Sequence, residues 1–339
     1  MTLQWKPEGS SGTIFSAPIQ HPGNRRLFAK DHLTVGLILP LETHPDTPAP
    51  TMRHHIRMAQ LAEESGIGAL WMRDVPFFDP SYGDTGQVFE PLIYIATLSA
   101  ATKSISLGTA GIVLPLREPK ILAKQVTSLD HLSGGRMILG LSSGDRPAEY
   151  PLFDIDFDTR GDRFRDAYNV YRTVTDQDFP AFMSPRFGNS HGHVDLLPKP
   201  PFDRTPSIAI GRGQQSIEWI AENMDGFIAP SPAVENLGVF AGEWAKLVRS
   251  INGENTFKPI GIAGYLDLVE DRNHPLERIR AGFRTGSIAL AEFLEAARLA
   301  GVSHAALNPK ISRRPYDELL ADLAENVIPS FPPILSEAS

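Results

Sequence analysis

Short apolar runs alternate with amphipathic stretches along most of this chain, and this alternation constrains its fold more than any single motif. The first run, residues 33–39, is rich in β-forming residues and stops at Pro40. A stretch that begins at Thr51 and ends near Gly66 follows it, with apolar or small residues at helical spacing. The same order of strand and helix returns along the chain, so we predict an α/β fold with a parallel sheet.

The alternation predicts eight strand–helix units. The predicted strands span residues 33–39, 69–74, 104–115, 137–141, 207–210, 226–230, 259–268 and 304–308. The predicted helices span residues 51–66, 88–101, 118–132, 160–175, 214–224, 233–250, 286–300 and 315–326. Eight such units in a chain of 339 residues predict a (β/α)8 TIM barrel. A doubly wound open sheet is the alternative, but its glycine fingerprint is missing from the segment after the first strand, LPLETHPDTPAP.

Three segments lie outside the repeating pattern. Residues 1–32 are polar and show no sustained periodicity, so we predict an irregular N-terminal arm on the surface or on a partner subunit. Residues 178–206 are rich in proline and predict an insertion that contains a short hairpin. We expect a C-terminal tail over residues 328–339, which leaves residues 33–327 as a single barrel domain.

The composition excludes several classes of site and partner. The chain contains no cysteine, which excludes disulfides, thiolate catalysis and zinc-ribbon sites. Its formal net charge of −8 argues against a nucleic-acid partner. No run of about 18 apolar residues predicts a membrane span, and the N-terminus lacks the basic and apolar pattern of a secretory signal. We therefore expect a cytoplasmic protein with a small-molecule substrate.

Active sites of (β/α)8 barrels form at the carboxyl ends of the strands, so the residues that follow each strand are the candidates. Histidines are poorly placed by this rule. His131 and His304 precede or begin strands and belong to the opposite face, and His54 and His55 lie within the first predicted helix. His44 lies in the first loop, where the sequence leaves its position unspecified. We therefore expect no metal site and no histidine-based triad.

Small, polar and cationic residues do follow the strands. Residues 73–74, Arg-Asp, follow the second strand, and residues 142–146, Ser-Ser-Gly-Asp-Arg, follow the fourth. The turn over residues 211–216, Gly-Arg-Gly-Gln-Gln-Ser, opens a helix, and free N–H groups at a helix N-terminus suit a phosphate. Arg146 or Arg212 can add charge-assisted hydrogen bonds. The same turn is also typical of an ordinary helix cap, so the spacing alone leaves both interpretations open.

Four segments taken together resemble the bacterial-luciferase-like flavin-dependent oxidoreductases. They are WMRDVPFFDPSYGDTGQVFEP, LGTAGIVLPLREP, AKQVTSLDHLSGGRMILGLSSGDRP and FDIDFDTRGDRFRDAY. The resemblance covers about residues 33–327 and is densest over residues 69–170. The combination of RDVPFFDP with SSGDRP is similar to one luciferase-type oxidoreductase subgroup of this family.

The resemblance implies a (β/α)8 barrel that holds FMN, or in some members the deazaflavin F420, at the carboxyl-terminal mouth. In the family the isoalloxazine ring lies against the end of the third strand, often over a non-prolyl cis peptide. The phosphate lies at the turn after the fifth strand. The resemblance and the loop pattern together assign cofactor binding to Thr109, Ala110, Gly111, Ser142, Ser143, Gly144, Arg146, Gly211, Arg212, Gly213, Gln214, Gln215 and Ser216.

One position departs from the family pattern. Many members carry a histidine directly after the second strand, in a DHH- or EHH-like sequence, where it serves as a base or stabiliser. This chain has Arg73-Asp74-Val75-Pro76 there instead. Asp74 keeps the acidic position, and Arg73, or Asp145 after the fourth strand, can act nearby. We therefore expect Arg73, Asp74 and Asp145 to carry catalysis.

The resemblance leads us to expect a two-component monooxygenase, in which a separate flavin reductase supplies reduced FMN and O2 oxidises a small organic substrate. A homodimer is also expected. The alternatives are F420-dependent hydride transfer, a flavin-binding barrel without turnover, and a barrel isomerase or aldolase whose substrate phosphate occupies the same turn. Phe77, Phe78, Tyr82 and Phe89 either form an apolar wall of the substrate site or pack the long loop in which they lie.

Overall fold

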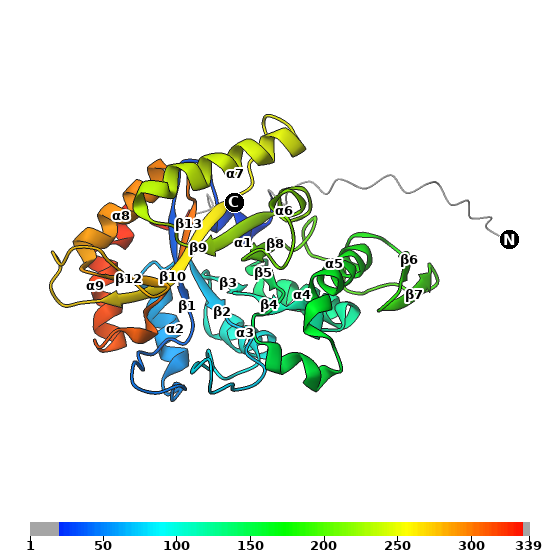
Figure 1. Ribbon diagram of the computed structural model, residues 1–339, viewed down its shortest axis with the longest axis horizontal. Coiled ribbons are helices and arrows are strands. Elements are labelled where there is room, and N and C mark those ends of the chain that lie inside the picture. Colours follow the sequence, from blue (N-terminus) through cyan, green and yellow to red (C-terminus); the bar gives the residue numbers. More distant parts are fainter. Residues whose placement is uncertain (1–19, 335–339) are drawn as a thin grey trace.

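A computed structural model describes residues 20–334 of the chain. Eight parallel strands close into a barrel, because each pairs with the next and the last pairs with the first. This closure confirms the predicted TIM barrel and excludes the open sheet (Figure 1). The barrel strands, in order, are β1 (Thr34–Ile38), β2 (Ala69–Met72), β3 (Ser106–Thr109), β5 (Met137–Ser142), β8 (Ser207–Ile210), β9 (Gly226–Pro230), β10 (Ile260–Leu268) and β13 (His304–Asn308).

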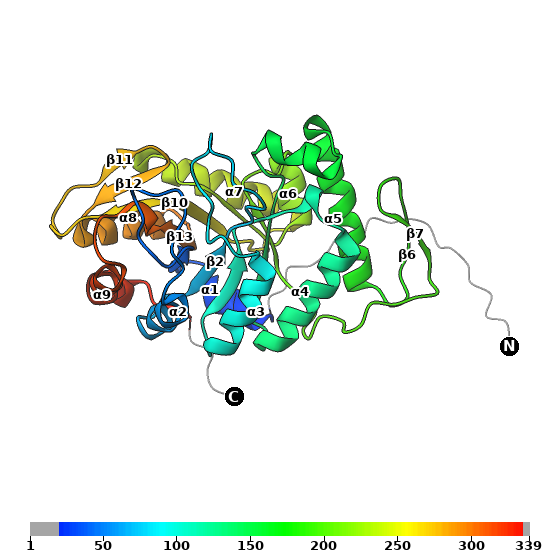
Figure 2. The ribbon, with the colours of Figure 1, turned by 90° about the horizontal axis from the view of Figure 1, so that it is seen from below.

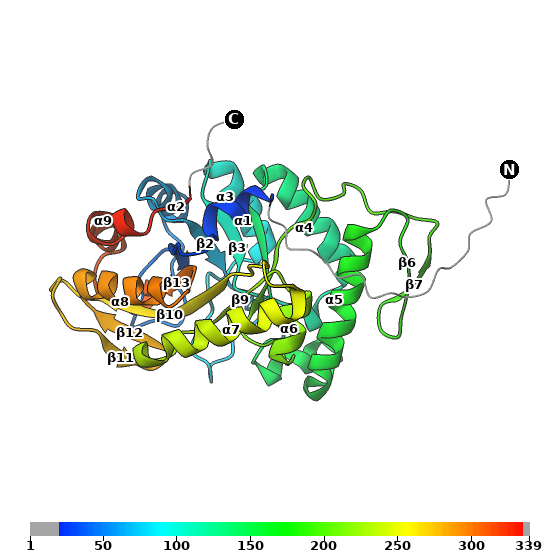
Figure 3. The same ribbon diagram turned by 90° about the horizontal axis from the view of Figure 1, so that it is seen from above.

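One helix follows each barrel strand and covers the outside of the barrel (Figures 1 and 3). Some helices begin later than the sequence predicts. The first begins at His55 rather than near Thr51, because Met52 and His54 adopt positive φ angles of 57° and 59°, which no helix accommodates. The helices are α2 (His55–Glu64), α3 (Pro91–Ala101), α4 (Pro119–Ser133), α5 (Arg160–Asp176), α6 (Ile217–Asn223), α7 (Leu237–Asn252), α8 (Ser287–Leu299) and α9 (Tyr316–Asn326).

Short strands interrupt the regular alternation at three places. The third predicted strand is split, and its second part, β4 (Ile112–Val113), pairs with β5. Inside the predicted insertion, β6 (Ala181–Ser184) and β7 (Gly188–His191) form a hairpin that projects beyond α5 (Figures 1 and 2). A second hairpin, β11 (Glu277–Ile279) and β12 (Gly282–Thr285), follows β10 and was not predicted. Its strands are short and charged, so no apolar periodicity marks them.

The predicted N-terminal arm is wrong in its second half, while residues 1–19 lie outside the described part. Residues Pro22–Leu27 form the short helix α1, which lies at the end of the barrel opposite the loops that follow β2 and β5 (Figure 2). Leu27 and Phe28 are buried and belong to the same core cluster as Trp71 inside the barrel. The main-chain N–H of Gly23 donates to the carbonyl of Gly135 at 2.7 Å. This segment therefore forms a helix and packs against the lower end of the barrel, where the sequence predicted an irregular arm on the surface or on a partner subunit.

The described part of the predicted tail is also packed. A single 3₁₀ turn, Ile328–Ser330, follows α9, and both Ile328 and Phe331 are buried. The N–H of Ile334 donates to the carbonyl of Arg26 at 2.9 Å, so this segment lies against α1. Within residues 20–334, no helix is long and apolar enough to cross a membrane.

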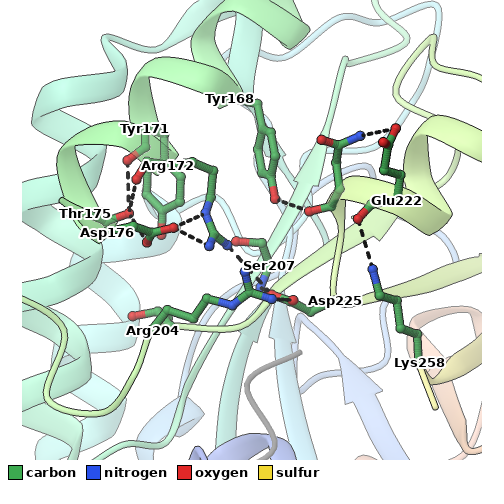
Figure 4. A network of polar contacts seen from close by, with 12 residues as sticks. Tyr168, Tyr171, Arg172, Thr175, Asp176, Arg204, Ser207, Glu222, Asp225 and Lys258 are labelled. Carbon is green, nitrogen blue, oxygen red and sulfur yellow. Dashed lines mark hydrogen bonds and ion pairs between the residues drawn. The ribbon is translucent and has the colours of Figure 1, made fainter. Parts of the chain in front are cut away.

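A buried polar network lies at the amino ends of β8, β9 and β10 (Figure 4). Asp225, which precedes β9, accepts hydrogen bonds from Arg204 and from the main-chain N–H of Ser207, and its carboxylate lies 4.0 Å from Arg172. Lys258 donates to the carbonyl of Ala221 at 2.7 Å, and burial lowers the pKa of its ammonium group to about 8. This network ties α5 and α6 to the lower face, which in such barrels serves stability.

Candidate functional site

Three adjoining cavities lie at the carboxyl ends of the barrel strands. Their volumes are about 300, 370 and 780 Å³. Arg73, the first residue after β2, lines all three. Concave sites of this size at the carboxyl-terminal face are typical of ligand binding in this fold.

The smallest of the three, which we call the apolar cavity, opens over the inner core of the barrel. Ile38, Trp71 and Ile228 belong both to that core and to the cavity wall. Because alternate side chains of a barrel strand point inward, these residues follow directly from the strand pattern. The cavity is lined by Ile38, Trp71, Arg73, Ala110, Ile210, Ile228, Ala229, Pro230, Ala263, Gly264, Tyr265, Ala281, Ala306 and Asn308.

The second, which we call the loop cavity, brings together most of the residues that the sequence singled out. It is lined by residues that follow β2, β3, β5 and β8, and it meets the apolar cavity at Arg73, Ala110 and Ile210. All three predicted catalytic residues line it. Its lining residues are Arg73, Asp74, Val75, Ala110, Gly111, Val113, Ser142, Ser143, Gly144, Asp145, Arg146, Ile210, Gly211, Arg212, Gly213 and Gln214.

Three predicted cofactor-binding residues line none of the three cavities, because their side chains bond within the protein. The Thr109 hydroxyl donates to the carbonyl of Gly140 at 2.7 Å and accepts its N–H at 2.9 Å. The Gln215 amide donates to the carbonyl of Gly161 at 2.8 Å. The Ser216 hydroxyl caps α6 by accepting the N–H of Trp219 at 3.1 Å. These three side chains therefore stabilise the segments around the cavities and do not line the cavities themselves.

The strand ends meet very closely beside Gly111. The peptide bond between Ala110 and Gly111 is cis, as the resemblance implies. A Cβ atom on Gly111 would lie 2.8 Å from Cγ1 of Ile210, and one on Gly140 would lie 1.7 Å from the carbonyl oxygen of Thr109. Glycine is therefore required at Gly140 for the backbones of β3 and β5 to approach each other, and at Gly111 for the close contact with Ile210 of β8.

The Asp74 carboxylate is engaged inside the protein. It accepts the N–H of Val113 at 2.9 Å and pairs with Arg117 at 2.6 Å, and its side chain is only 1% exposed. Burial raises the pKa of this carboxyl group, although Arg117 opposes the change. Asp74 thus fastens β4 to the end of β2. Asp145 is exposed by contrast, and its main-chain carbonyl accepts the Tyr82 hydroxyl.

Arg73 belongs to an ion cluster that the sequence did not reveal. Its guanidinium donates to Asp84, and the other carboxylate oxygen of Asp84 lies 2.7 Å from Nζ of Lys310. Burial opposes ionisation of Asp84, but the two cations hold its pKa well below the usual range. Gln87 fixes the loop, since its side chain accepts the N–H of Arg73 at 2.9 Å and donates to its carbonyl at 2.7 Å.

The third cavity, which we call the basic cavity, lies between the loops after β1, β2 and β13 and the β11–β12 hairpin. It meets the apolar cavity at Arg73, Tyr265 and Ala281. Tyr82 lines it, whereas the exposed Phe77, Phe78 and Phe89 line none of the three cavities. Its lining residues are His44, Pro45, Thr47, Arg73, Ser81, Tyr82, Gly83, Asp84, Asp145, Arg146, Tyr265, Arg280, Ala281, Lys310 and Ile311.

His44 is the histidine that reaches this mouth. Its Nδ1 lies 2.9 Å from the carbonyl of Thr47, and its side chain is nearly buried. His304 lies at the start of β13, at the lower end of the strand, as the sequence predicts. Within residues 20–334, no group of three or more histidine or carboxylate side chains is arranged to hold a metal ion.

The site residues missed by sequence reasoning come mainly from the last part of the chain. Tyr265 lies inside β10 and Asn308 ends β13, and both line the apolar cavity. Asp84 lies in the loop after β2, eleven positions beyond its partner Arg73. The available signal was that Asn308 ends the eighth predicted strand and Lys310 follows it, because the carboxyl ends of all eight strands meet at one face.

Sequence comparison identifies related proteins over most of the barrel. A family described as luciferase-like monooxygenase matches residues 33–249. The 4-hydroxyprotoasukamycin monooxygenase of Streptomyces nodosus subsp. asukaensis is 29% identical over 171 residues, which are 50% of this chain and 45% of that protein. The chain thus spans less than half the length of this relative.

Solved structures with the same fold cover nearly the whole barrel. An F420-dependent secondary alcohol dehydrogenase, in complex with an F420–acetone adduct, has a TM-score of 0.71 at 16% identity over 88% of this chain and 99% of that chain. The oxygenating constituent of 3,6-diketocamphane monooxygenase from Pseudomonas putida, in complex with FMN, has a TM-score of 0.65 at 13% identity. It covers 90% of this chain and 100% of that chain. At these identities the likeness concerns the fold.

Proposed function

Because the chain belongs to the luciferase-like monooxygenase family, we propose that it is a flavin-dependent monooxygenase that uses reduced FMN and O2 on a small organic substrate. The observation that carries this proposal is the junction at Arg73, where an apolar cavity and a polar loop cavity meet. FMN has the same division, with a flat apolar ring system joined to a polar ribityl phosphate. The FMN complex of a protein with the same fold supports the choice of cofactor.

The residues present fit such a cofactor. Trp71 and aliphatic side chains line the apolar cavity, where a ring system would lie. In the loop cavity the Ser142 hydroxyl donates to the carbonyl of Gly111 at 3.1 Å and can still accept a hydrogen bond from a ribityl chain. A Cβ on Gly211 would meet no atom within 4 Å, so this turn faces open space. We assign the phosphate to the turn over residues 211–214, where Arg212 supplies an exposed cation.

When bound, reduced FMN would supply the electrons with which O2 oxidises the substrate. The chain itself supplies orientation and charge. Arg73 keeps its proton, since burial lowers the pKa of the guanidinium but Asp84, Tyr265 and Asp145 together raise it above its usual value. It is therefore a fixed cation at the point where cofactor and substrate would meet, and it can stabilise negative charge there. Asp74 holds the wall of the loop cavity in place through Val113 and Arg117.

The remaining assignments belong to the same proposal. Asp145 lines the loop and basic cavities, so its carboxylate is placed to contact substrate. We further propose that a separate reductase supplies the reduced flavin and that the protein acts as a homodimer in the cytoplasm.

Cofactor titration tests the proposal directly. The purified protein is titrated with FMN, F420 and riboflavin, and we expect FMN to bind with micromolar or tighter affinity. Oxygen uptake by the complex with reduced FMN should exceed that of free reduced FMN once a substrate is present. If neither FMN nor F420 binds, the proposal is wrong, and a barrel isomerase or aldolase becomes the better interpretation.

The second candidate function is hydride transfer with F420. It is supported by the F420-dependent dehydrogenase whose fold matches with a TM-score of 0.71. Tight binding of F420 together with weak binding of FMN would favour it, and the reduced complex would then transfer hydride without consuming oxygen. A bound flavin that supports neither reaction would indicate a binding protein without turnover.

A further inference from the structure

We infer that the basic cavity binds the carboxylate of an anionic organic substrate, and that Arg280 and Arg146 hold this group. The inference rests on the proposed function, because it names the class of substrate that would enter the same mouth. It concerns the cavity of about 780 Å³ beside the apolar cavity, whose volume is sufficient for a small organic molecule.

Cations outnumber carboxylates in the wall of this cavity. Four cationic side chains line it, and only two carboxylates, those of Asp84 and Asp145, face them. Asp84 is already shared between Arg73 and Lys310, so one carboxylate is held by two cations. The charge that remains available in the cavity is positive, and a negatively charged ligand would balance it.

Arg146 is the buried member of this group. Only 4% of its surface is exposed. Its guanidinium donates to the main-chain carbonyls of Phe77 at 3.3 Å and Asp84 at 2.9 Å, and it lies 5.0 Å from the ring of Tyr82. These partners are dipoles and a π-face, and within residues 20–334 no carboxylate forms an ion pair with it. The buried Glu149 is an acidic neighbour, and burial raises the pKa of its carboxyl group although Arg146 opposes the change. A buried guanidinium without a carboxylate in ion-pair contact is costly, so an anion bound in the cavity would stabilise it.

Arg280 is the exposed member. It lies in the turn between β11 and β12, so the hairpin carries its side chain to the edge of the cavity. An exposed cation and a buried cation in the wall of one cavity are well suited to capture and then orient a carboxylate.

The position of this cavity indicates how the rest of the substrate would lie. The basic cavity meets the apolar cavity at Arg73, Tyr265 and Ala281. A molecule whose carboxylate lies between Arg280 and Arg146 can therefore extend an apolar or aromatic part toward Arg73. The substrate class that follows is a small organic acid with an apolar body.

Calorimetric titration with matched acids and amides tests the inference. The full chain is titrated with benzoate, phenylacetate and octanoate, and with the amide of each. We expect at least one acid to bind about tenfold more tightly than its amide, which corresponds to about 1.4 kcal/mol. Arg280→Gln should remove most of this preference and leave the affinity for the amide unchanged. Arg284→Gln removes the same charge from the same hairpin outside the cavity, where Arg284 lies 3.7 Å from Asp267, and should keep the preference.

The outcomes of these titrations test the anion site and the proposed function separately. If no acid binds more tightly than its amide, or if Arg280→Gln and Arg284→Gln behave alike, the inference is wrong. FMN is titrated into the same samples as a separate readout. FMN binding without a preference for acids overturns the inference and leaves the proposed function standing. A preference for acids without binding of FMN or F420 supports the anion site and contradicts the proposed function.

Discussion

The indole N–H of Trp71 donates a hydrogen bond to Nε2 of His304 at 2.9 Å, inside the barrel beneath the apolar cavity. Since Nε2 accepts this bond, the neutral imidazole carries its proton on Nδ1, which lies 2.7 Å from the hydroxyl of Thr34. That hydroxyl donates in turn to the carbonyl of Leu27 at 2.9 Å. The chain of bonds links the floor of the mouth to the segment that closes the lower end of the barrel.

The burial of His304 in this chain of hydrogen bonds predicts that the free energy of unfolding falls in acid. Burial lowers the pKa of His304 from 6.5 to about 3. Between these values the unfolded chain binds a proton that the folded chain does not, so the free energy of unfolding falls as the pH falls. The loss is about 1.4 kcal/mol per pH unit below 6.5, or about 2 kcal/mol at pH 5. Urea unfolding at pH 7 and pH 5 should show that His304→Gln loses less stability over this interval than the natural chain; equal losses would contradict the assignment.

Arg212 should distinguish the phosphate from the rest of the cofactor. Arg212→Ala is expected to weaken FMN binding about tenfold, or about 1.4 kcal/mol, and to leave riboflavin binding unchanged, because riboflavin lacks the phosphate. Fluorescence titration with both ligands measures this difference. Arg249→Ala, an exposed arginine in the last turn of α7, is the matched control and should change neither affinity. Equal weakening of both ligands by Arg212→Ala would refute the assignment to phosphate.

Asp74 should contribute to stability through its buried pair with Arg117. Asp74→Asn removes the charge from a carboxylate that is 1% exposed, while Arg117 keeps its second partner, Glu90, at 3.0 Å. Because burial disfavours the ionised carboxyl group of Asp74, we expect the free energy of unfolding to fall by less than the about 3–5 kcal/mol that breaking a buried ion pair usually costs. The exposed pair between Asp46 and Arg313 provides the control, and Asp46→Asn should cost less than about 1 kcal/mol. Similar losses in the two variants would show that the Asp74 pair is no stronger than a surface pair.

Asp225 should contribute more to the free energy of unfolding than a surface carboxylate does, because the buried network of Figure 4 converges on it. Asp225→Asn removes the negative charge beside Arg204 and Arg172, although Arg172 keeps its pair with Asp176, and we expect a loss of about 3–5 kcal/mol. Urea unfolding checks this value. Asp178→Asn, at a side chain that is 85% exposed and 4.0 Å from Lys199, should change stability by less than about 0.5 kcal/mol.

The barrel itself was predictable because its signal is local. Each barrel strand is a short apolar run, and each helix repeats its apolar residues with a fixed period, so both can be recognised within a window of about 11–18 residues. The errors lie where local signals are weak or ambiguous. The helix α1 has only six residues, and the β11–β12 hairpin is short and charged. The packing of Leu27 under the barrel depends on strands far away in the chain, which no local pattern records.

Only part of the candidate site was predictable from the sequence. The loop cavity could be foreseen because glycine-rich and polar turns follow β3, β5 and β8, and the family resemblance indicates their role. The basic cavity could not, because its members lie far apart in the chain. Asp84 and Lys310 are 226 positions apart, yet their charged atoms lie 2.7 Å from each other.

The sequence by itself determined the alternation of strands and helices, the glycines that let strand ends approach, and the absence of a histidine after β2. Only the tertiary structure decided that Arg73 joins three cavities and that Arg146 is buried with no carboxylate in ion-pair contact among residues 20–334. The physical reason is that secondary structure follows from periodicity along the chain, whereas the charge and burial of a side chain depend on every strand that the closed barrel brings beside it.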